Sequence, residues 1–416
     1  MSTPAAGPSA IPNPLPMIGG ELLANPYPMY AMLRRSSPVF RIPAAGGQAE
    51  PGQWLLLRHE DVTQALRDPR FSADRRRAVL FQQNRALLPP EILGEQGGFR
   101  TMLVMDPPDH TRVRGLVNKA FTPRRVASLR GHIEGIVEEL LGSVAARGGM
   151  DVIADFAAPL PAIVIAELLG VPREDYPQFK AWSNDLVSLA GGMDRNDALG
   201  RFRRGLDALL GYLREIISVR RREPRDDLIS AMIAAQEAHD ALSDGELLAT
   251  SNLLLLAGHE TTTNLIGNGL LALLRNPGEL ERLRAEPALL RSAIEEMLRY
   301  DSPVQATVRI PVEEIELSGQ RIPPGALVVV GIGAANRDPA VFPEPDRFDV
   351  ARTDNRHLSF GFGAHFCLGA PLARLEAEIA FQMLLERFPG LRLEKADVTY
   401  RPNVVLRGLT ALPVAF

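Results

Sequence analysis

The chain has 416 residues, of which 46% are hydrophobic and 23% are charged, so it can bury one large core or two modest ones. Its formal net charge of −4 at pH 7 argues against general binding to nucleic acid, and its single cysteine excludes an internal disulfide. The N-terminus carries no basic segment followed by an apolar run, and the longest apolar runs fall well short of the ~20 residues of a membrane span. We therefore expect a cytoplasmic protein without a membrane anchor.

The first part of the chain predicts an arm followed by a small mixed region. Residues 1–24 are small and proline-rich, which predicts a flexible arm ahead of a single domain over residues 25–416. The apolar run at 54–57 predicts a short buried strand, and residues 61–66 predict a helix. Weak periodicity and many Arg, Gln, Gly and Pro residues over 70–100 predict a long surface loop.

The rest of the chain separates helices from strands. Helical periodicity dominates from about 111 to 299, and a strand-rich section follows at about 308–334, with a turn at Ser318-Gly319. A further helix near 372–387 and a short β region end the chain. This order favours an α+β fold that is predominantly α-helical with a smaller β-rich region, and it argues against a doubly wound parallel sheet.

One predicted helix is unusually long. Ser243 and Glu246 form a capping-box pattern, and the helix can continue to Arg275, directly before Asn276 and Pro277. Its 32 residues would span roughly 48 Å, enough to cross a whole domain. The helix is apolar on most sides, which is typical of a buried helix.

The middle of this helix carries the run Ala257-Gly258-His259-Glu260-Thr261-Thr262. A glycine, a carboxylate and two hydroxyls are unfavourable in a buried helix, and such a conflict is expected where function overrides local propensity. The structural alternative is a kink in which threonine hydroxyls bond back to helix carbonyls.

The only cysteine lies in a glycine-rich run, Phe360-Gly361-Phe362-Gly363-Ala364-His365-Phe366-Cys367-Leu368-Gly369. Glycines let a backbone approach a flat ligand, and a helix that begins just after the cysteine would stabilise a thiolate through its dipole and unpaired amides. The run therefore indicates a cysteine held as an anion against something planar. The alternatives are an inert core cysteine and a nucleophile paired with His365, for which no third group is evident.

This loop resembles the haem-binding loop of the cytochrome P450 family. The family pattern Phe-x-x-Gly-x-x-x-Cys-x-Gly is matched by Phe360, Gly363, Cys367 and Gly369. The resemblance runs from about residue 25 to residue 416 and implies the P450 fold of a soluble bacterial member, with haem b (iron protoporphyrin IX) as cofactor and Cys367 as the iron ligand. Thiolate ligation donates electron density to the iron and favours O–O cleavage.

The resemblance also assigns roles around the cofactor. Glu260 and Thr261 match the acid and the alcohol of the family's oxygen-activation motif, beside Ala257 and Gly258, where a widened turn would admit O₂. Haem propionates need cationic or hydrogen-bonding partners. The residues at the family's contacting positions are His110, Arg114, Arg309 and His365; the alternative for the first two is a solvated helix face.

Two further sets of residues follow from the same resemblance. Glu296, Arg299 and Arg347 would form a buried network behind the cysteine loop, although Glu296 and Arg299 alone would read as an exposed helix pair. The segments that line the substrate pocket map to mostly aliphatic residues, which predicts a hydrophobic substrate held mainly by burial. They contribute Leu80, Phe81, Leu186, Leu189, Val304, Ala306, Thr307, Val404 and Val405, and the pair Gly191-Gly192 predicts a hinge for a lid.

The implied activity is an O₂-dependent monooxygenase that hydroxylates or epoxidises a hydrophobic small molecule. The sequence contains no dinucleotide fingerprint and no flavodoxin-like or ferredoxin-like segment, so electrons are expected from a separate ferredoxin and its reductase. Their landing site would be Arg112, Lys119, Arg124 and Arg125, for which a solvated face is the alternative. Three other functions stay open: a peroxide-driven peroxygenase, a non-catalytic haem-based sensor, and a cysteine hydrolase without haem.

Overall fold

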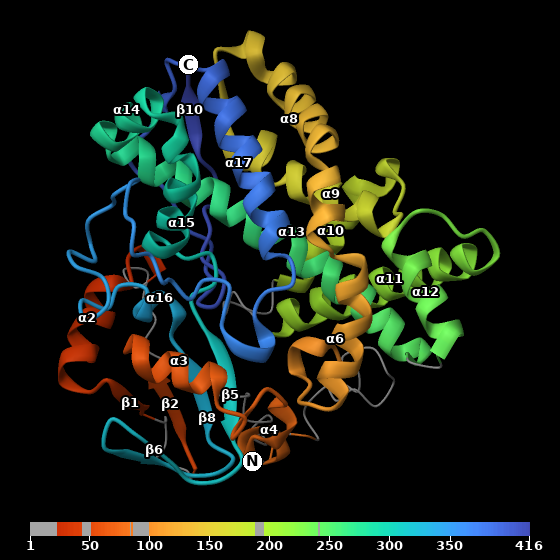
Figure 1. The fold of residues 1–416 in the computed structure, drawn as a ribbon, viewed down its shortest axis with the longest axis vertical. Coiled ribbons are helices and arrows are strands. Elements are labelled where there is room, and N and C mark those ends of the chain that lie inside the picture. The colour runs from red at the N-terminus through yellow and green to blue at the C-terminus, as the bar shows by residue number, and fades with distance from the viewer. Residues whose placement is uncertain (1–22, 44–50, 84, 86–99, 188–194, 240–241) are drawn as a thin grey trace, which may run out of the picture.

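The computed structural model describes residues 23–43, 51–83, 85, 100–187, 195–239 and 242–416. A large helical region and a smaller sheet region lie side by side (Figure 1). Within the described residues no helix is both long enough and apolar enough to span a bilayer. The helices are α2 (Tyr27–Ser36), α3 (His59–Arg67), α4 (Val79–Gln83), α6 (Asp109–Ala120), α7 (Pro123–Ser128), α8 (Arg130–Val144), α9 (Pro159–Leu169), α10 (Tyr176–Val187), α11 (Arg195–Arg222), α12 (Leu228–His239), α13 (Asp244–Arg275), α14 (Pro277–Ala285), α15 (Leu290–Tyr300), α16 (Ile332–Ala335) and α17 (Ala370–Arg387).

The main sheet has the strand order β1-β2-β8-β5-β3, in which only β2 and β8 pair in parallel. Its β2 is the predicted buried strand, and Trp54, Leu55 and Leu56 are all buried there. Two smaller sheets complete the β region. The strands are β1 (Val39–Ile42), β2 (Gln53–Leu56), β3 (Phe71–Ser72), β4 (Gly149–Asp151), β5 (Thr307–Pro311), β6 (Ile315–Leu317), β7 (Gln320–Ile322), β8 (Leu327–Val330), β9 (Arg392–Leu393) and β10 (Pro413–Ala415).

The predicted order of elements is confirmed over most of the chain. The helices α6 to α15 dominate the stretch predicted to be helical, which the short strand β4 interrupts, and the strands β5 to β8 follow. The turn between β6 and β7 uses Ser318 and Gly319, both with positive φ angles (46° and 76°). The surface loop predicted over 70–100 is wrong in its first half, because β3, a short 3₁₀ helix at Arg75–Arg77 and α4 lie there. Residues 84 and 86–99 lie outside the described residues.

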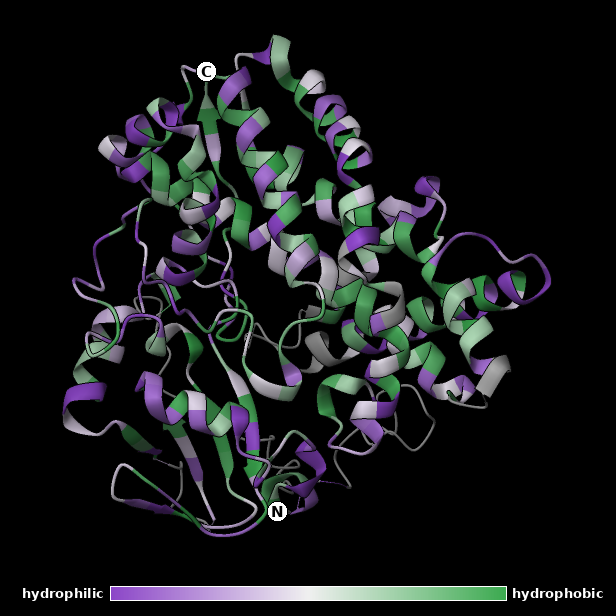
Figure 2. Ribbon diagram, viewed as in Figure 1, coloured by the Kyte–Doolittle hydropathy of each residue, from purple (hydrophilic) through white to green (hydrophobic). Residues whose placement is uncertain are grey.

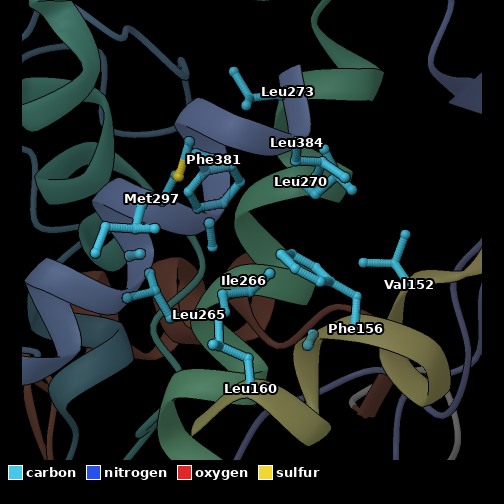
Figure 3. Close-up of a cluster of buried hydrophobic side chains, with 14 of the residues drawn as sticks. Val152, Phe156, Leu160, Leu265, Ile266, Leu270, Leu273, Met297, Phe381 and Leu384 are labelled. Carbon is cyan, nitrogen blue, oxygen red and sulfur yellow. The ribbon is translucent and has the colours of Figure 1, made fainter. Parts of the chain in front are cut away.

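Helix α13 is the long helix predicted from its caps. Ser243 accepts a hydrogen bond from the backbone of Glu246, whose side chain bonds back to the Ser243 amide, and the helix extends over 32 residues. Its C-terminal half is packed against α9, α15, α17 and the segment that precedes α9 (Figure 3). The outer helices alternate between hydrophilic and hydrophobic residues, as helices with one buried face do (Figure 2). The side chains around α13 in Figure 3 include Phe156, Leu160, Met297, Phe381 and Leu384.

A buried carboxylate, Asp301, ties the two ends of the chain together. It accepts hydrogen bonds from the hydroxyls of Tyr27 and Tyr400, at 2.6 and 3.1 Å, and from Arg407 Nε at 2.5 Å. Arg407 also donates to the carbonyls of residues 23 and 24, at the end of the predicted arm. Residues 400–409, which we call the C-terminal loop, are thereby fixed beside α15 and α2.

Candidate functional site

The cysteine loop has the local geometry that its sequence predicts. Helix α17 begins at Ala370, so Cys367 lies just before a helix N-terminus. The amide of Cys367 donates to the Phe360 carbonyl at 2.8 Å, which closes the loop. Gly363 has a φ of 71°, and a Cβ there would lie 2.9 Å from the Leu66 carbonyl oxygen, so only glycine fits.

The surroundings of Cys367 raise the pKa of its thiol on balance, although nearby donors favour the thiolate. Burial raises the pKa of the Cys367 thiol, while hydrogen bonds from the amides of Gly369 and Ala370 and the charges of Arg114 and Arg374 lower it. A metal cation bound to the sulfur would displace the thiol proton, so metal binding would outweigh the effect of burial on this pKa. As the single cysteine of the sequence, Cys367 has no disulfide partner in the chain.

Beside the cysteine loop, two histidines and two arginines from three elements converge. The rings of His110 in α6 and His365 in the loop are 4.2 Å apart. Arg114 donates to the carbonyl of Phe366 at 2.5 Å. Arg309 in β5 is 5% exposed, and its one side-chain hydrogen bond among the described residues goes to the Val308 carbonyl, at 2.9 Å.

This cluster has more positive charge than the protein compensates. Burial and the charge of Arg75 lower the pKa of Arg309 to about 10, and burial and Arg309 lower the pKa of His365 to about 3. Asp106 is the one carboxylate that acts on either group. Within the described residues, the buried Nε2 of His110 has no hydrogen-bond partner. A ligand with carboxylates, such as the two propionates of haem, fits this set of donors.

The functional run in α13 lies in unbroken helix, without the widened turn expected at Ala257 and Gly258. Thr261 Oγ1 donates to the Ala257 carbonyl at 3.0 Å, which is the back-bond that the structural alternative predicts. A Cβ on Gly258 would lie 2.8 Å from Cγ1 of Ile165 in α9, so this glycine allows the two helices to pack closely.

Glu260 is the buried acid of this run, with 6% of its surface exposed. Burial raises the pKa of its carboxyl, and the guanidinium of Arg401 partly opposes that shift. The Nη1 atom of Arg401 lies 3.6 Å from Oε1 of Glu260. Sequence reasoning missed Arg401, because 140 residues lie between the two positions in the chain.

Comparison with known proteins identifies the family. The family model described as Cytochrome P450 matches residues 81–406. The chain belongs to the cytochrome P450 family. The Bacillus subtilis polyketide biosynthesis cytochrome P450 PksS is 42% identical over 402 residues, which cover 95% of this chain and 97% of the relative. The vitamin D(3) 25-hydroxylase of Pseudonocardia autotrophica is 43% identical over 402 residues, which cover 96% and 95%.

Solved structures agree with the sequence relatives. The structure of P450BioI in complex with hexadec-9Z-enoic acid ligated acyl carrier protein has a TM-score of 0.85 and 40% identity, and covers 96% of this chain and 100% of that chain. The predicted fold is confirmed, and this P450 is a haem-thiolate monooxygenase of a bacterial family that includes small-molecule hydroxylases.

The network behind the P450 cysteine loop is built with a different arginine from the one predicted. Glu296 and Arg299 form a fully buried pair at 2.7 Å. The side chain of Arg347, however, is 55% exposed and pairs with Glu344; only its carbonyl accepts a bond from Arg299. The second arginine on Glu296 is Arg352, whose Nε lies 3.1 Å from Oε2. Both arginines belong to one irregular segment, so the pattern alone could not say which side chain turns inward.

The network reaches the cysteine loop through one asparagine. Arg299 Nη1 donates to the carbonyl of Asn336 at 3.0 Å. The Asn336 side chain then accepts from the Leu358 amide and donates to Ser359 Oγ, at 2.7 and 2.8 Å. Ser359 directly precedes Phe360, whose ring is covered by the guanidinium of Arg374 at 4.4 Å.

The structure brings some of the predicted pocket segments together. The amide of Gln305 donates to the Val405 carbonyl at 2.8 Å, and Val304 pairs with Leu406, so the 304–307 segment adjoins the C-terminal loop. Leu186 is 8% exposed and belongs to a cluster of buried residues from α6 and from α9 to α13. Leu80 and Phe81 are partly buried in α4, and Ala306 and Thr307 lie at the start of β5. Val404 is partly buried and Val405 is 42% exposed; Leu189 and the predicted hinge Gly191-Gly192 lie outside the described residues.

The predicted electron-donor patch is partly neutralised by carboxylates. Arg112 pairs with Glu246, the residue that caps α13, and Arg125 pairs with Asp226 at 3.0 Å. Arg124 is exposed, and nothing is described of the Lys119 side chain. A substitution of Arg112 would therefore disturb the cap of α13 as well as the surface charge.

Sequence reasoning also missed two ionisable residues near the site. Arg75 stands in a run of three arginines in the segment predicted to be a loop, and acts on Arg309. Glu376 lies in α17 at a position where the spacing of Leu372, Ile379 and Ala380 predicts a core residue. That spacing could have identified Glu376 as a buried acid from the sequence.

Proposed function

We propose that this monooxygenase binds haem b through Cys367 and inserts one atom of O₂ into a C–H or C=C bond of a hydrophobic small molecule. The observation that carries the proposal is the single cysteine at the N-terminus of α17, with amides directed at its sulfur and the arginines Arg114 and Arg309 in the adjacent cluster. The other oxygen atom leaves as water, which requires two electrons and two protons. Haem, when bound, would supply the one-electron and O₂ chemistry.

The residues of the chain then have distinct tasks. Cys367 supplies the thiolate, while His110, Arg114, Arg309 and His365 hold the propionates. Thr261 holds its proton on Oγ1, where it donates to the Ala257 carbonyl and can accept from a second donor. Glu260 supplies the protons, because burial raises the pKa of its carboxyl and so lets it hold a proton more readily than an exposed carboxyl does.

The electrons would come from a separate ferredoxin and its reductase. Exposed Arg124 and the partly exposed Arg112 and Arg125 give the α6–α7 surface positive charge that an acidic ferredoxin can complement. Cytoplasmic localisation follows as an expectation from this partnership.

The substrate would be a mid-sized hydrophobic molecule. The predicted pocket segments contribute aliphatic side chains such as Val304, Ala306, Val404 and Val405. Two relatives are named a vitamin D(3) 25-hydroxylase and a polyketide biosynthesis cytochrome P450, which supports a small-molecule substrate here. A panel of neutral, anionic and cationic compounds of matched size, scored by spin-state shift, tests this; tight binding restricted to small charged compounds would contradict it.

A reconstituted assay separates the proposal from its alternatives. With a ferredoxin system, product should form and should account for most of the O₂ consumed. A peroxygenase would instead need added peroxide and would be indifferent to the ferredoxin, and a sensor would bind haem without turning over any compound of the panel. The proposed proton-delivery residues argue for the monooxygenase, because peroxide already carries its electrons and protons.

A further inference from the structure

One face of α13 carries a polar stripe that lies against the C-terminal loop. Glu260, Asn264 and Asn268 are four residues apart and therefore share a face of the helix. Gly408 comes so close that a Cβ there would lie 1.8 Å from Oδ1 of Asn264. Asn268 Nδ2 donates to the carbonyl of Arg407 at 3.0 Å. The loop therefore follows the helix over two turns.

At the end of this stripe stands the acid proposed to deliver protons. Arg401 is the charged group that acts on Glu260 among the described residues, at 3.6 Å. The Glu260 side chain is 7% exposed and the Arg401 side chain 29%. A charge pair with this little solvent is screened weakly, so its energy depends strongly on the position of the loop.

The same loop forms a turn two residues further on, beside the predicted substrate pocket. Asn403 Oδ1 accepts from the amides of Val405 and Leu406, both at 2.9 Å, which fixes the turn. The turn is joined to the 304–307 segment through Gln305. A molecule that contacts Val405 would therefore contact the same C-terminal loop that carries Arg401.

We propose that Arg401 is a positioning residue that holds Glu260 against the C-terminal loop as a carboxylate, and so makes proton delivery depend on the position of that loop. The inference rests on the role of Glu260 given above. The guanidinium favours the ionised carboxyl and keeps it on the loop side of α13.

The test compares Arg401→Gln, Arg401→Lys, Glu260→Gln and the double variant E260Q/R401Q. Infrared spectroscopy of the ferric holoenzyme follows the C=O stretch of the protonated Glu260 carboxyl, identified by its absence in the E260Q variants, against pH. In R401Q the midpoint of this titration should move upward, because the lowering charge is gone. With substrate and ferredoxin system, R401Q should also lose coupling, with product per O₂ falling ~10-fold.

Controls make the outcomes distinct. Arg401→Lys keeps the charge and should restore both readouts toward wild type. Arg392→Gln in β9, whose side chain bonds to the Gly390 carbonyl and to no other group among the described residues, should change neither. If R401Q matches wild type in both readouts while E260Q uncouples, the inference is overturned and the role of Glu260 stands.

The double variant decides whether Arg401 acts through Glu260. The inference requires that R401Q has no further effect on coupling once Glu260 is glutamine; an equal loss in both backgrounds would overturn it. If E260Q alone leaves coupling unchanged, the proposed proton delivery by Glu260 fails. In that case the infrared titration still reports whether the contact sets the ionisation of the carboxyl.

Discussion

Replacing Glu376 by glutamine should remove a large part of the pH dependence of this protein's stability. Glu376 is 1% exposed in α17, and its Oε2 has no hydrogen-bond partner among the described residues. Burial raises the pKa of its carboxyl from 4.5 to about 8, and the bond with Thr262 in α13 only partly opposes this shift. The side chain is therefore a neutral acid in the folded protein at pH 7.

The sign and the size of the effect follow from this shift. Between pH 4.5 and pH 8 the folded state keeps a proton that the unfolded chain loses, so the free energy of unfolding falls as pH rises. Relative to the fully protonated state, the carboxyl costs ~0.8 kcal/mol at pH 5 and ~4 kcal/mol at pH 7.5, a loss of ~3 kcal/mol over that interval. Glutamine has the same shape and does not titrate, so Glu376→Gln should remove this loss.

Guanidinium unfolding of the holoprotein, followed by the fluorescence of the two tryptophans, measures the effect at pH 5 and pH 7.5. The stability of Glu376→Gln relative to wild type should rise by ~3 kcal/mol between the two pH values. Glu378→Gln is the matched control, because this carboxyl is partly exposed and paired with Arg130 and Arg291; it should keep the wild-type slope. Equal slopes for wild type and Glu376→Gln would refute the burial argument.

Three further predictions address the site and its supports. Thr261→Ala should bind haem and substrate and still consume O₂, but release more of it as peroxide. If a peroxide assay shows the same coupling of O₂ consumption to product as in wild type, the proposed role of Thr261 in proton delivery is wrong. Arg352→Gln should lower the free energy of unfolding by ~3 kcal/mol, because it leaves a buried carboxylate with one partner fewer, whereas Arg347→Gln should cost under ~1 kcal/mol; equal losses in urea titrations would restore Arg347 to the network. Arg124→Glu should slow reduction by an acidic ferredoxin in stopped-flow traces without changing substrate affinity, and the wild-type rate should fall as salt shortens the Debye length to ~10 Å at 0.1 M. If the rate of reduction changes neither with Arg124→Glu nor with salt, this surface is not the docking site of the ferredoxin.

What the sequence could predict was local in the chain. The cap of α13 depends on Ser243 and Glu246, three residues apart, and the prediction is confirmed. The position of Cys367 before a helix follows from the residues directly around it, and α17 begins at Ala370 as expected.

What the sequence could not predict was the direction of side chains across distant segments. Arg347 and Arg352 lie in one irregular segment without periodicity, and only the folded backbone shows that Arg352 turns toward Glu296. The contact of Arg401 with Glu260 joins the C-terminal loop to α13, and no spacing rule relates them.

The absorption spectrum of the reduced, CO-bound protein tests the central claim most directly. Wild type should show the red-shifted Soret band of thiolate ligation, and Cys367→Ser should lose that band together with monooxygenase activity. A protein that purifies without any Soret band, or a Cys367→Ser variant that keeps the red-shifted one, would contradict the assignment of Cys367 as the iron ligand.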